Sequence, residues 1–135
     1  MYCPRTGTRL SPTDGNVPSA GTAVAVVVFD NGTTLSVRRH TTMGRAPETD
    51  RFVTSQERAG IRVEDPDESM SRAHLLLRVT DWEVEVIDLG SRNGTFVQMG
   101  DGVWRRLMPG LAYRVADGQV VRLGGRSFSL YHSTR

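Results

Sequence analysis

The sequence predicts an all-β fold, a sandwich or barrel built from many short strands, on three observations. Apolar and β-branched runs of strand length recur along the chain, separated by turn signals such as Asn31-Gly32, Asp117-Gly118 and Gly124-Gly125. No window of about a dozen residues carries the apolar repeat of a helix. The stretch Trp82–Ile87 alternates between apolar and polar side chains over part of its length, as a half-buried strand does. Short strands at regular spacing are typical of sandwiches and barrels.

The expected strands begin with a hairpin. Ala23–Asp30 and Thr33–Val37 flank Asn31-Gly32, which predicts a two-residue turn of type I′. A second antiparallel pair, His74–Thr80 and Trp82–Leu89, is joined tightly at Asp81. The shorter strands that follow are Thr95–Val97, Trp104–Leu107, Tyr113–Val115, Val120–Leu123 and Phe128–Tyr131. The acidic stretch from Ala46 to Ser69 is expected to contain an enlarged loop, and its strand register is left open.

Length and composition favour a single domain preceded by an arm. A chain of 135 residues is long enough to bury one core without disulfides or metals. Residues 1–21 contain three prolines and three glycines with little apolar periodicity, so we expect a flexible N-terminal arm and a folded domain over 22–135. The longest apolar stretch, Ala23–Phe29, is only strand-length, and no signal-peptide core is present at the start. We therefore expect a cytoplasmic protein without a membrane partner.

The charge pattern does not by itself argue for a nucleic-acid partner. The net charge is +2, and all 17 basic residues are arginine, a bias that we attribute to a GC-rich bacterial genome. Between Glu48 and Glu68 the net charge is −4, which leaves +6 for the rest of the chain, spread too thinly for a nucleic-acid surface. Every cationic contact of this chain can nevertheless be planar and bidentate, because a guanidinium offers paired N–H donors.

The sequence offers no catalytic or metal-binding constellation. Cys3 is the only cysteine, so neither a disulfide framework nor a cysteine zinc site can form. Ser71 and His74 are close in sequence, but no nucleophile turn or acid partner accompanies them. We therefore expect a binding protein with no cofactor, no metal and no enzymatic activity.

Three short polar signatures carry the functional prediction. They are Gly44-Arg45, Ser71-Arg72-Ala73-His74 and Asn93-Gly94-Thr95, and each falls between expected strands and hence on a loop. An arginine, a hydroxyl and an amide presented from such loops suit a doubly charged anion with many acceptors, such as a phosphate ester. The tripeptide Asn-Gly-Thr also occurs at Asn31, where we interpret it as a plain hairpin turn.

Together the three signatures resemble the forkhead-associated (FHA) domain, a phosphothreonine-binding module. Their order matches, as does the run Asp88-Leu-Gly-Ser-Arg-Asn-Gly-Thr-Phe-Val97, and the resemblance extends over Ala23–His132. It implies an FHA-type β-sandwich of about eleven strands with the ligand-binding loops at one end.

The resemblance also implies a role for each site residue. Arg45 contacts the phosphate directly and Ser71 donates a hydrogen bond to it, while Arg72 lies beside the ligand. Asn93 holds the backbone of an extended peptide. The family often has a small or hydroxylated residue where this chain has Arg92. That arginine could add a third cation at the phosphate or reach an acidic residue beyond the phosphothreonine, and we favour the second role. The structural support of the site is assigned to Gly44, His74, Gly94 and Thr95.

The implied function is a phosphothreonine-dependent adaptor in Ser/Thr kinase signalling, with preference for phosphothreonine over phosphoserine. Its partner would be a threonine-phosphorylated protein or peptide, namely a Ser/Thr kinase or a kinase substrate. Two alternatives stay open: an FHA scaffold in phosphate-independent protein contact, and, less favoured, a basic β-domain for nucleic acid. A further hypothesis is that threonines of the arm become phosphorylated and occupy the site; these are Thr6, Thr8, Thr13 and Thr22.

Overall fold

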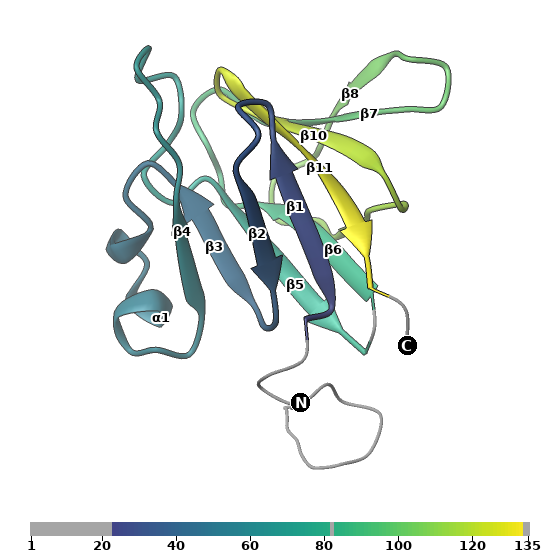
Figure 1. Cartoon of the computed structure of the whole chain (residues 1–135). Helices are drawn as coiled ribbons and strands as arrows, with labels where there is room; N and C mark the ends of the chain where they lie inside the picture. The colour runs from purple at the N-terminus through teal and green to yellow at the C-terminus, as the bar shows by residue number, and fades with distance from the viewer. Residues whose placement is uncertain (1–22, 82, 134–135) are drawn as a thin grey trace.

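Two β-sheets stacked face to face form the protein, as seen in a computed structural model that describes residues 23–81 and 83–133 (Figure 1). The six-stranded sheet has the order β2-β1-β11-β10-β7-β8, and its strands are β1 (Ala25–Phe29), β2 (Thr34–Val37), β7 (Thr95–Gln98), β8 (Trp104–Arg106), β10 (Gln119–Leu123) and β11 (Arg126–His132). The five-stranded sheet has the order β4-β3-β5-β6-β9, and its strands are β3 (Thr41–Gly44), β4 (Ala59–Arg62), β5 (Leu75–Thr80), β6 (Glu83–Asp88) and β9 (Tyr113–Arg114). The predicted all-β sandwich of eleven strands is thereby confirmed. The predicted flexible arm, residues 1–21, lies outside the described residues.

The core lies between the two sheets and follows the alternation of the strands. Along β1, the side chains of Ala25, Val27 and Phe29 are buried while the residues between them are half-buried. Strand β11 lies antiparallel to β1 with Phe128 directly opposite Phe29, and the two rings are 5.5 Å apart at their centroids. Such a tilted aromatic pair adds to the hydrophobic burial that joins the sheets.

Two strands and two short helical segments were missed by the sequence analysis, all within or beside the acidic stretch. Strand β3 reads Thr-Thr-Met-Gly, yet each of its residues is buried because β4 and β5 flank it. Strand β4 lies parallel to β3. Parallel neighbours need a crossover connection, and here a 3-10 turn, η1 (Pro47–Thr49), and one helical turn, α1 (Arg51–Thr54), supply it. The expected enlarged loop is therefore partly regular structure.

Asp50 fixes this crossover to the sheet. Its carboxylate caps α1 by accepting the amide of Phe52 at 2.9 Å, and it also accepts Thr42 Oγ1 at 2.6 Å and Arg58 Nη1 at 2.8 Å. Burial by itself would raise the pKa of Asp50, but these hydrogen bonds and the Arg58 charge outweigh it and lower the pKa below its ordinary value of 3.8. The carboxylate thus stabilises the fold in its ionised form.

The first hairpin differs from its prediction. The amide of Gly32 donates to the carbonyl of Phe29, and only Gly32 has a positive φ, of 89°, so the turn is not of type I′. The loop instead contains three residues, with a tight turn followed by a left-handed glycine. Asp30, the first residue of this loop, is bound to the neighbouring strand, since its amide donates to the carbonyl of Ser127 and its carboxylate pairs with Arg126 at 2.9 Å.

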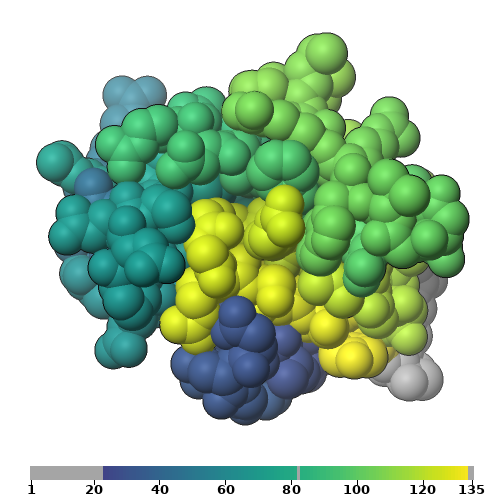
Figure 2. All heavy atoms as spheres, turned by 90° about the horizontal axis from the view of Figure 1, so that it is seen from above, coloured from purple at the N-terminus to yellow at the C-terminus, as the bar shows by residue number. Residues whose placement is uncertain are grey.

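Several loops gather at one end of the sandwich, at the top of Figure 1, as predicted. Seen from above, the β1–β2 turn, the β10–β11 turn and the β4–β5 loop lie beside one another (Figure 2). Arg126 joins the three, since it pairs with Asp30 and its Nη1 donates to the carbonyl of Glu64 at 3.2 Å. With 16% of its side chain exposed, Arg126 is a structural residue.

We predict that Asp50→Ala lowers the free energy of unfolding by about 2 kcal/mol or more, because it leaves the hydroxyl of Thr42 and the guanidinium of Arg58 without their shared acceptor. Urea unfolding near neutral pH measures this loss. Since the folded-state pKa of Asp50 is depressed, the difference between wild type and variant should be complete above about pH 4 and shrink as the pH falls below it.

Glu48→Ala is the matched control, because Glu48 lies on the same segment but its ion pair with Arg62 is exposed on both sides. An equal loss of stability in both variants would show that the crossover contributes through charge alone and not through the buried contacts of Asp50.

Candidate functional site

The predicted site forms where the end of β3, the β4–β5 loop and the β6–β7 loop meet. Gly44 is the last residue of β3, and a Cβ on it would lie 2.0 Å from the carbonyl oxygen of Arg72. Close approach of the β4–β5 loop therefore requires this glycine. Two hydrogen bonds join the end of β3 to this loop: the Arg45 amide donates to the Ser71 carbonyl, and the Ala46 amide donates to the Arg72 carbonyl.

Arg45 is half-buried and held by one edge of its guanidinium. Its Nε donates to the carbonyl of Met70 at 2.9 Å. Within the described part of the chain, its two Nη groups have no hydrogen-bond or ion-pair partner. A guanidinium tethered in this way presents a pair of parallel N–H donors in a fixed orientation, the geometry that binds phosphate or carboxylate oxygens bidentately.

Ser71 lies next to Arg45, and its hydroxyl is oriented by a backbone donor. Ser71 Oγ accepts the amide of Arg92 at 2.9 Å, which occupies a lone pair of that oxygen. Among the described residues nothing accepts the hydroxyl hydrogen, so this hydrogen is available to donate to a ligand. The predicted donor role of Ser71 is thus compatible with the arrangement of the loops.

His74 contacts both loops from the interior. The imidazole is fully buried, its Nδ1 accepts the amide of Ser71 at 3.1 Å, and its Nε2 donates to the carbonyl of Gly94 at 2.9 Å. This pattern requires the neutral ring with the proton on Nε2. Burial lowers the pKa of His74 below 6.5, against the opposing effects of the Gly94 hydrogen bond and of the charges of Asp88 and Asp65. The ring is therefore neutral at physiological pH.

Three side chains of the site bind consecutive carbonyls of the β4–β5 loop. Arg92 Nη2 donates to the carbonyl of Glu68 at 3.0 Å, Asn93 Nδ2 to that of Ser69 at 2.7 Å, and Arg45 Nε to that of Met70. Glu68 has a φ of 53°, in the left-handed region that is unusual for a non-glycine residue. This loop is thus fixed from two sides, and the side chains that fix it are those predicted to bind the ligand.

Asp88 is the support that the sequence analysis missed. It is buried, and its carboxylate accepts four hydrogen bonds: from the amides of Gly90 and Ser91 and from the hydroxyls of Ser91 and Thr95. Ser91 Oγ in turn accepts the amide of Gly94, which has a φ of 86°. An Asp at the end of a strand with a Ser three residues later is the sequence signal of such a loop. Thr95 and Gly94 are thus joined to Asp88, Thr95 directly and Gly94 through Ser91.

A second missed support anchors the β4–β5 loop. Met70 is fully buried, and its backbone packs against Gly124, where a Cβ would lie 3.0 Å from the Met70 nitrogen. Asp65 Oδ2 accepts the amide of Met70, and its Oδ1 accepts the hydroxyl of Ser69. Asp65 therefore has a structural role that the amino-acid composition of the acidic stretch did not indicate.

The remaining exposed charges of the site have opposite signs. Arg72 and Arg92 are exposed, and the side chain of Arg72 has no hydrogen-bond or ion-pair partner in the described residues. The β4–β5 loop contributes exposed Glu64, Asp67 and Glu68. The ligand loops therefore carry both exposed cations and exposed acids.

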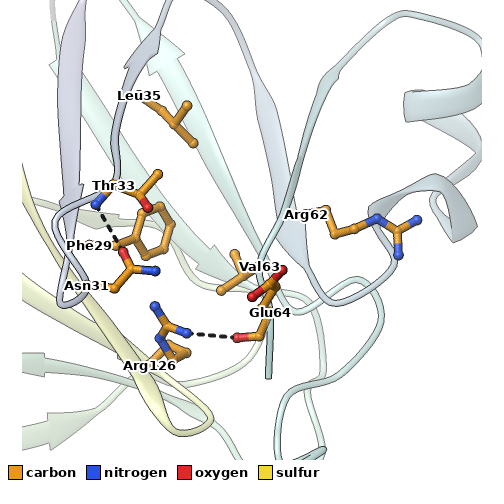
Figure 3. Close-up of a pocket in the computed structure, with 8 residues that line it drawn as sticks. All are labelled: Phe29, Asn31, Thr33, Leu35, Arg62, Val63, Glu64 and Arg126. Atoms are coloured by element: carbon orange, nitrogen blue, oxygen red, sulfur yellow. Dashed lines mark hydrogen bonds between the residues drawn. The ribbon is translucent and has the colours of Figure 1, made fainter. Parts of the chain in front are cut away.

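A pocket of about 260 Å³ opens beside these loops, between the β1–β2 turn and the end of β4 (Figure 3). Phe29, Leu35 and Val63 provide apolar side chains, and Asn31, Thr33, Arg62, Glu64 and Arg126 complete the lining. No residue predicted to bind the phosphate lines it. The site is therefore a loop surface and not this pocket.

Residues 23–81 and 83–133 contain no cluster of His, Cys, Asp or Glu that could hold a metal ion. The same residues contain no helix long and apolar enough to cross a membrane. Phe96 and Trp104 are half-buried on the outer face of the six-stranded sheet. Trp82 lies outside the described residues.

Comparison with curated proteins finds two relatives. The chain is 35% identical over 97 residues to an oxoglutarate dehydrogenase inhibitor of Corynebacterium glutamicum, covering 68% of this chain and 58% of the relative. It is 33% identical over 85 residues to the protein of the same name in Corynebacterium efficiens, covering 63% of this chain and 51% of the relative. The chain thus spans little more than half the length of either relative.

Solved structures resemble the fold as a whole. One, from a structural and functional study of phosphothreonine-dependent FHA domain interactions, has a TM-score of 0.60 and 26% identity, covering 84% of this chain and all of that domain. Another, the FhaA FHA domain complexed with the intracellular domain of Rv3910, has a TM-score of 0.56 and 25% identity over 78% of this chain and 98% of that domain. The FHA domain family matches residues 41–124, more than half of the chain and all three polar signatures. The chain therefore belongs to the FHA-domain family of binding modules.

Proposed function

We propose that this chain binds threonine-phosphorylated segments of partner proteins through the loop surface around Arg45, Ser71 and Asn93. The observation that carries this proposal is the geometry of Arg45, whose Nε is tethered to Met70 while both Nη groups face no protein acceptor in the described residues. A phosphate monoester carries about −1.5 to −2 charges near neutral pH and accepts several hydrogen bonds, so it fits a bidentate guanidinium beside a hydroxyl donor.

The remaining site residues extend this contact along the peptide. Asn93 Nδ2 is bound to Ser69, but its Oδ1 has no donor among the described residues and is available to accept a peptide amide. Arg72 adds an exposed cation next to the phosphate. Arg92, fixed by Glu68, is placed to meet an acidic residue of the ligand.

As an FHA module the chain would act as an adaptor between a Ser/Thr protein kinase and the phosphorylated partner, in the cytoplasm. A second candidate is binding to an oxoglutarate dehydrogenase, which the two inhibitors of that name favour. Dependence on phosphate distinguishes the two candidates. The first requires a phosphothreonine on the partner, whereas the second is tested by measuring whether the chain binds unphosphorylated oxoglutarate dehydrogenase.

We predict that Arg45→Ala and Ser71→Ala each weaken phosphothreonine peptide binding, Arg45→Ala by about ten- to a hundredfold, since a hydrogen bond to a charged group contributes about 1.5–3 kcal/mol. Fluorescence anisotropy with a degenerate phosphothreonine peptide pool, beside unphosphorylated and phosphoserine pools, measures the effect. Arg38→Ala is the matched control, because Arg38 is an exposed arginine that follows β2, away from the ligand loops. Equal binding by wild type and Arg45→Ala would refute the assignment.

We predict that Asn93→Ala weakens binding of the same phosphothreonine pool by about fivefold or more, from loss of a backbone hydrogen bond and of the Ser69 contact. Asn31→Ala is an internal control within the same tripeptide sequence, since Asn31 Oδ1 accepts the amide of Thr33 in the β1–β2 turn. The second variant should bind as wild type does. Similar losses in both variants would place the peptide contact outside the β6–β7 loop.

We predict that acid weakens the fold through His74. Because its folded-state pKa is lowered, the unfolded chain binds a proton first, and stability falls as the pH drops below about 6.5 and through the folded-state pKa. Urea unfolding at a series of pH values should show this loss, and His74→Gln should lack the His74 part of it. The variant is needed because the pKa of His40 is also lowered, to about 4, by desolvation and by Arg58, with the same sign. An unchanged pH profile in the variant would contradict the neutral, buried ring.

A further inference from the structure

A cationic and aromatic surface lies on the outer face of the six-stranded sheet, beside the β6–β7 loop. We call it the arginine–aromatic patch and define it by Phe96 of β7, Trp104 and Arg106 of β8, and Arg122 of β10. The strand register places Arg106 and Arg122 directly opposite Phe96 on its two neighbours. These three side chains thus form one row across three strands.

The rings hold both guanidinium groups in place. Arg122 Cζ lies 4.7 Å from the ring centroid of Phe96 and 4.6 Å from that of Trp104, and Arg106 Cζ lies 5.9 Å from that of Phe96. Within the described chain neither arginine forms an ion pair with a carboxylate. A guanidinium over a ring keeps its N–H edge available for a carboxylate or phosphate while losing little entropy on binding.

The patch is continuous with the proposed phosphopeptide site. A Cβ on Gly94 would lie 2.7 Å from Arg106 Nε, so the Arg106 side chain covers the backbone of Gly94, the residue that follows Asn93. A peptide chain that leaves the phosphate and passes Asn93 therefore meets Arg106 next, and then Phe96 and Arg122.

We propose that the arginine–aromatic patch binds an acidic segment of the phosphothreonine-containing partner, beyond the part that Asn93 holds. This inference rests on the proposed function and adds to it a preference for carboxylates at a distance from the phosphate. The proposal rests on charge complementarity. The guanidinium groups of Arg106 and Arg122 are oriented by the rings and have no carboxylate partner in the described chain, so they match a run of acidic side chains.

The test uses phosphothreonine peptide pools that differ only in a flanking run, of aspartate or of asparagine, placed on either side of the phosphothreonine. Wild type should bind one of the aspartate pools about three- to tenfold more tightly than its asparagine counterpart, the effect of two partly exposed ion pairs. The double variant Arg106→Gln/Arg122→Gln should bind both pools equally, with its affinity for the asparagine pools unchanged. The preference of wild type should decline with added salt.

Arg105→Gln is the matched control, since Arg105 is the exposed neighbour of Arg106 on β8 and pairs with buried Val97, on the opposite side of the strand from Phe96. It should keep the aspartate preference. Equal binding of aspartate and asparagine pools by wild type, or an equal loss in the control, would overturn the proposal. Tighter binding of mixed-sequence DNA than of the aspartate pools would do the same.

Failure of the proposed function gives a different result, in which wild type binds phosphorylated and unphosphorylated asparagine pools alike. In that case the unphosphorylated aspartate pool tests the patch. If the double variant Arg106→Gln/Arg122→Gln loses binding of that pool, the acidic partner is supported. If the double variant binds that pool as wild type does, the proposal is overturned.

Discussion

The buried imidazole of His74 is the contact on which the arrangement of the ligand loops depends. It lies just before β5, and its two ring nitrogens bind the backbone of two different loops, at Ser71 and at Gly94. Neither hydrogen bond could be replaced by water, because the ring is fully buried. The orientation of the Ser71 hydroxyl and the path of the chain around Gly94 are therefore linked through one neutral side chain.

Asp88 performs the complementary task within the β6–β7 loop. Its position at the end of β6, directly opposite Leu75 of β5, places its carboxylate close to the His74 side of the sandwich. By accepting four hydrogen bonds it gathers the amides and hydroxyls of a loop that would otherwise leave them unpaired in the interior. The side chains proposed to bind the ligand at the surface are thus supported by a buried polar network, which positions them before a ligand binds.

The sequence predicted most of the fold because the strands at its centre are strongly patterned. Trp82–Leu89 shows the alternation of a half-buried strand and was placed within one residue of β6. Strand β3 could not be found in the same way, since Thr41 and Thr42 are buried by strands on both sides and not by an apolar pattern of their own. The hairpin at Asn31-Gly32 was misjudged because an Asn-Gly pair does not by itself set the loop length: the loop also includes Asp30, and only Gly32 in it has a positive φ.

The chemistry of the site residues was enough to identify them in the sequence, but it did not reveal the hydrogen bonds through which they hold the ligand loops. Arg45, Arg92 and Asn93 each use one donor to bind the β4–β5 loop and keep the remaining donors or acceptors toward solvent. These contacts restrict the rotamers of long side chains in advance, so a ligand does not have to bear that entropic cost. The same contacts join the β4–β5 loop to the β6–β7 loop and to the end of β3. Shape and charge at the binding surface are therefore properties of the three segments together, and a substitution at any one of them acts on the other two.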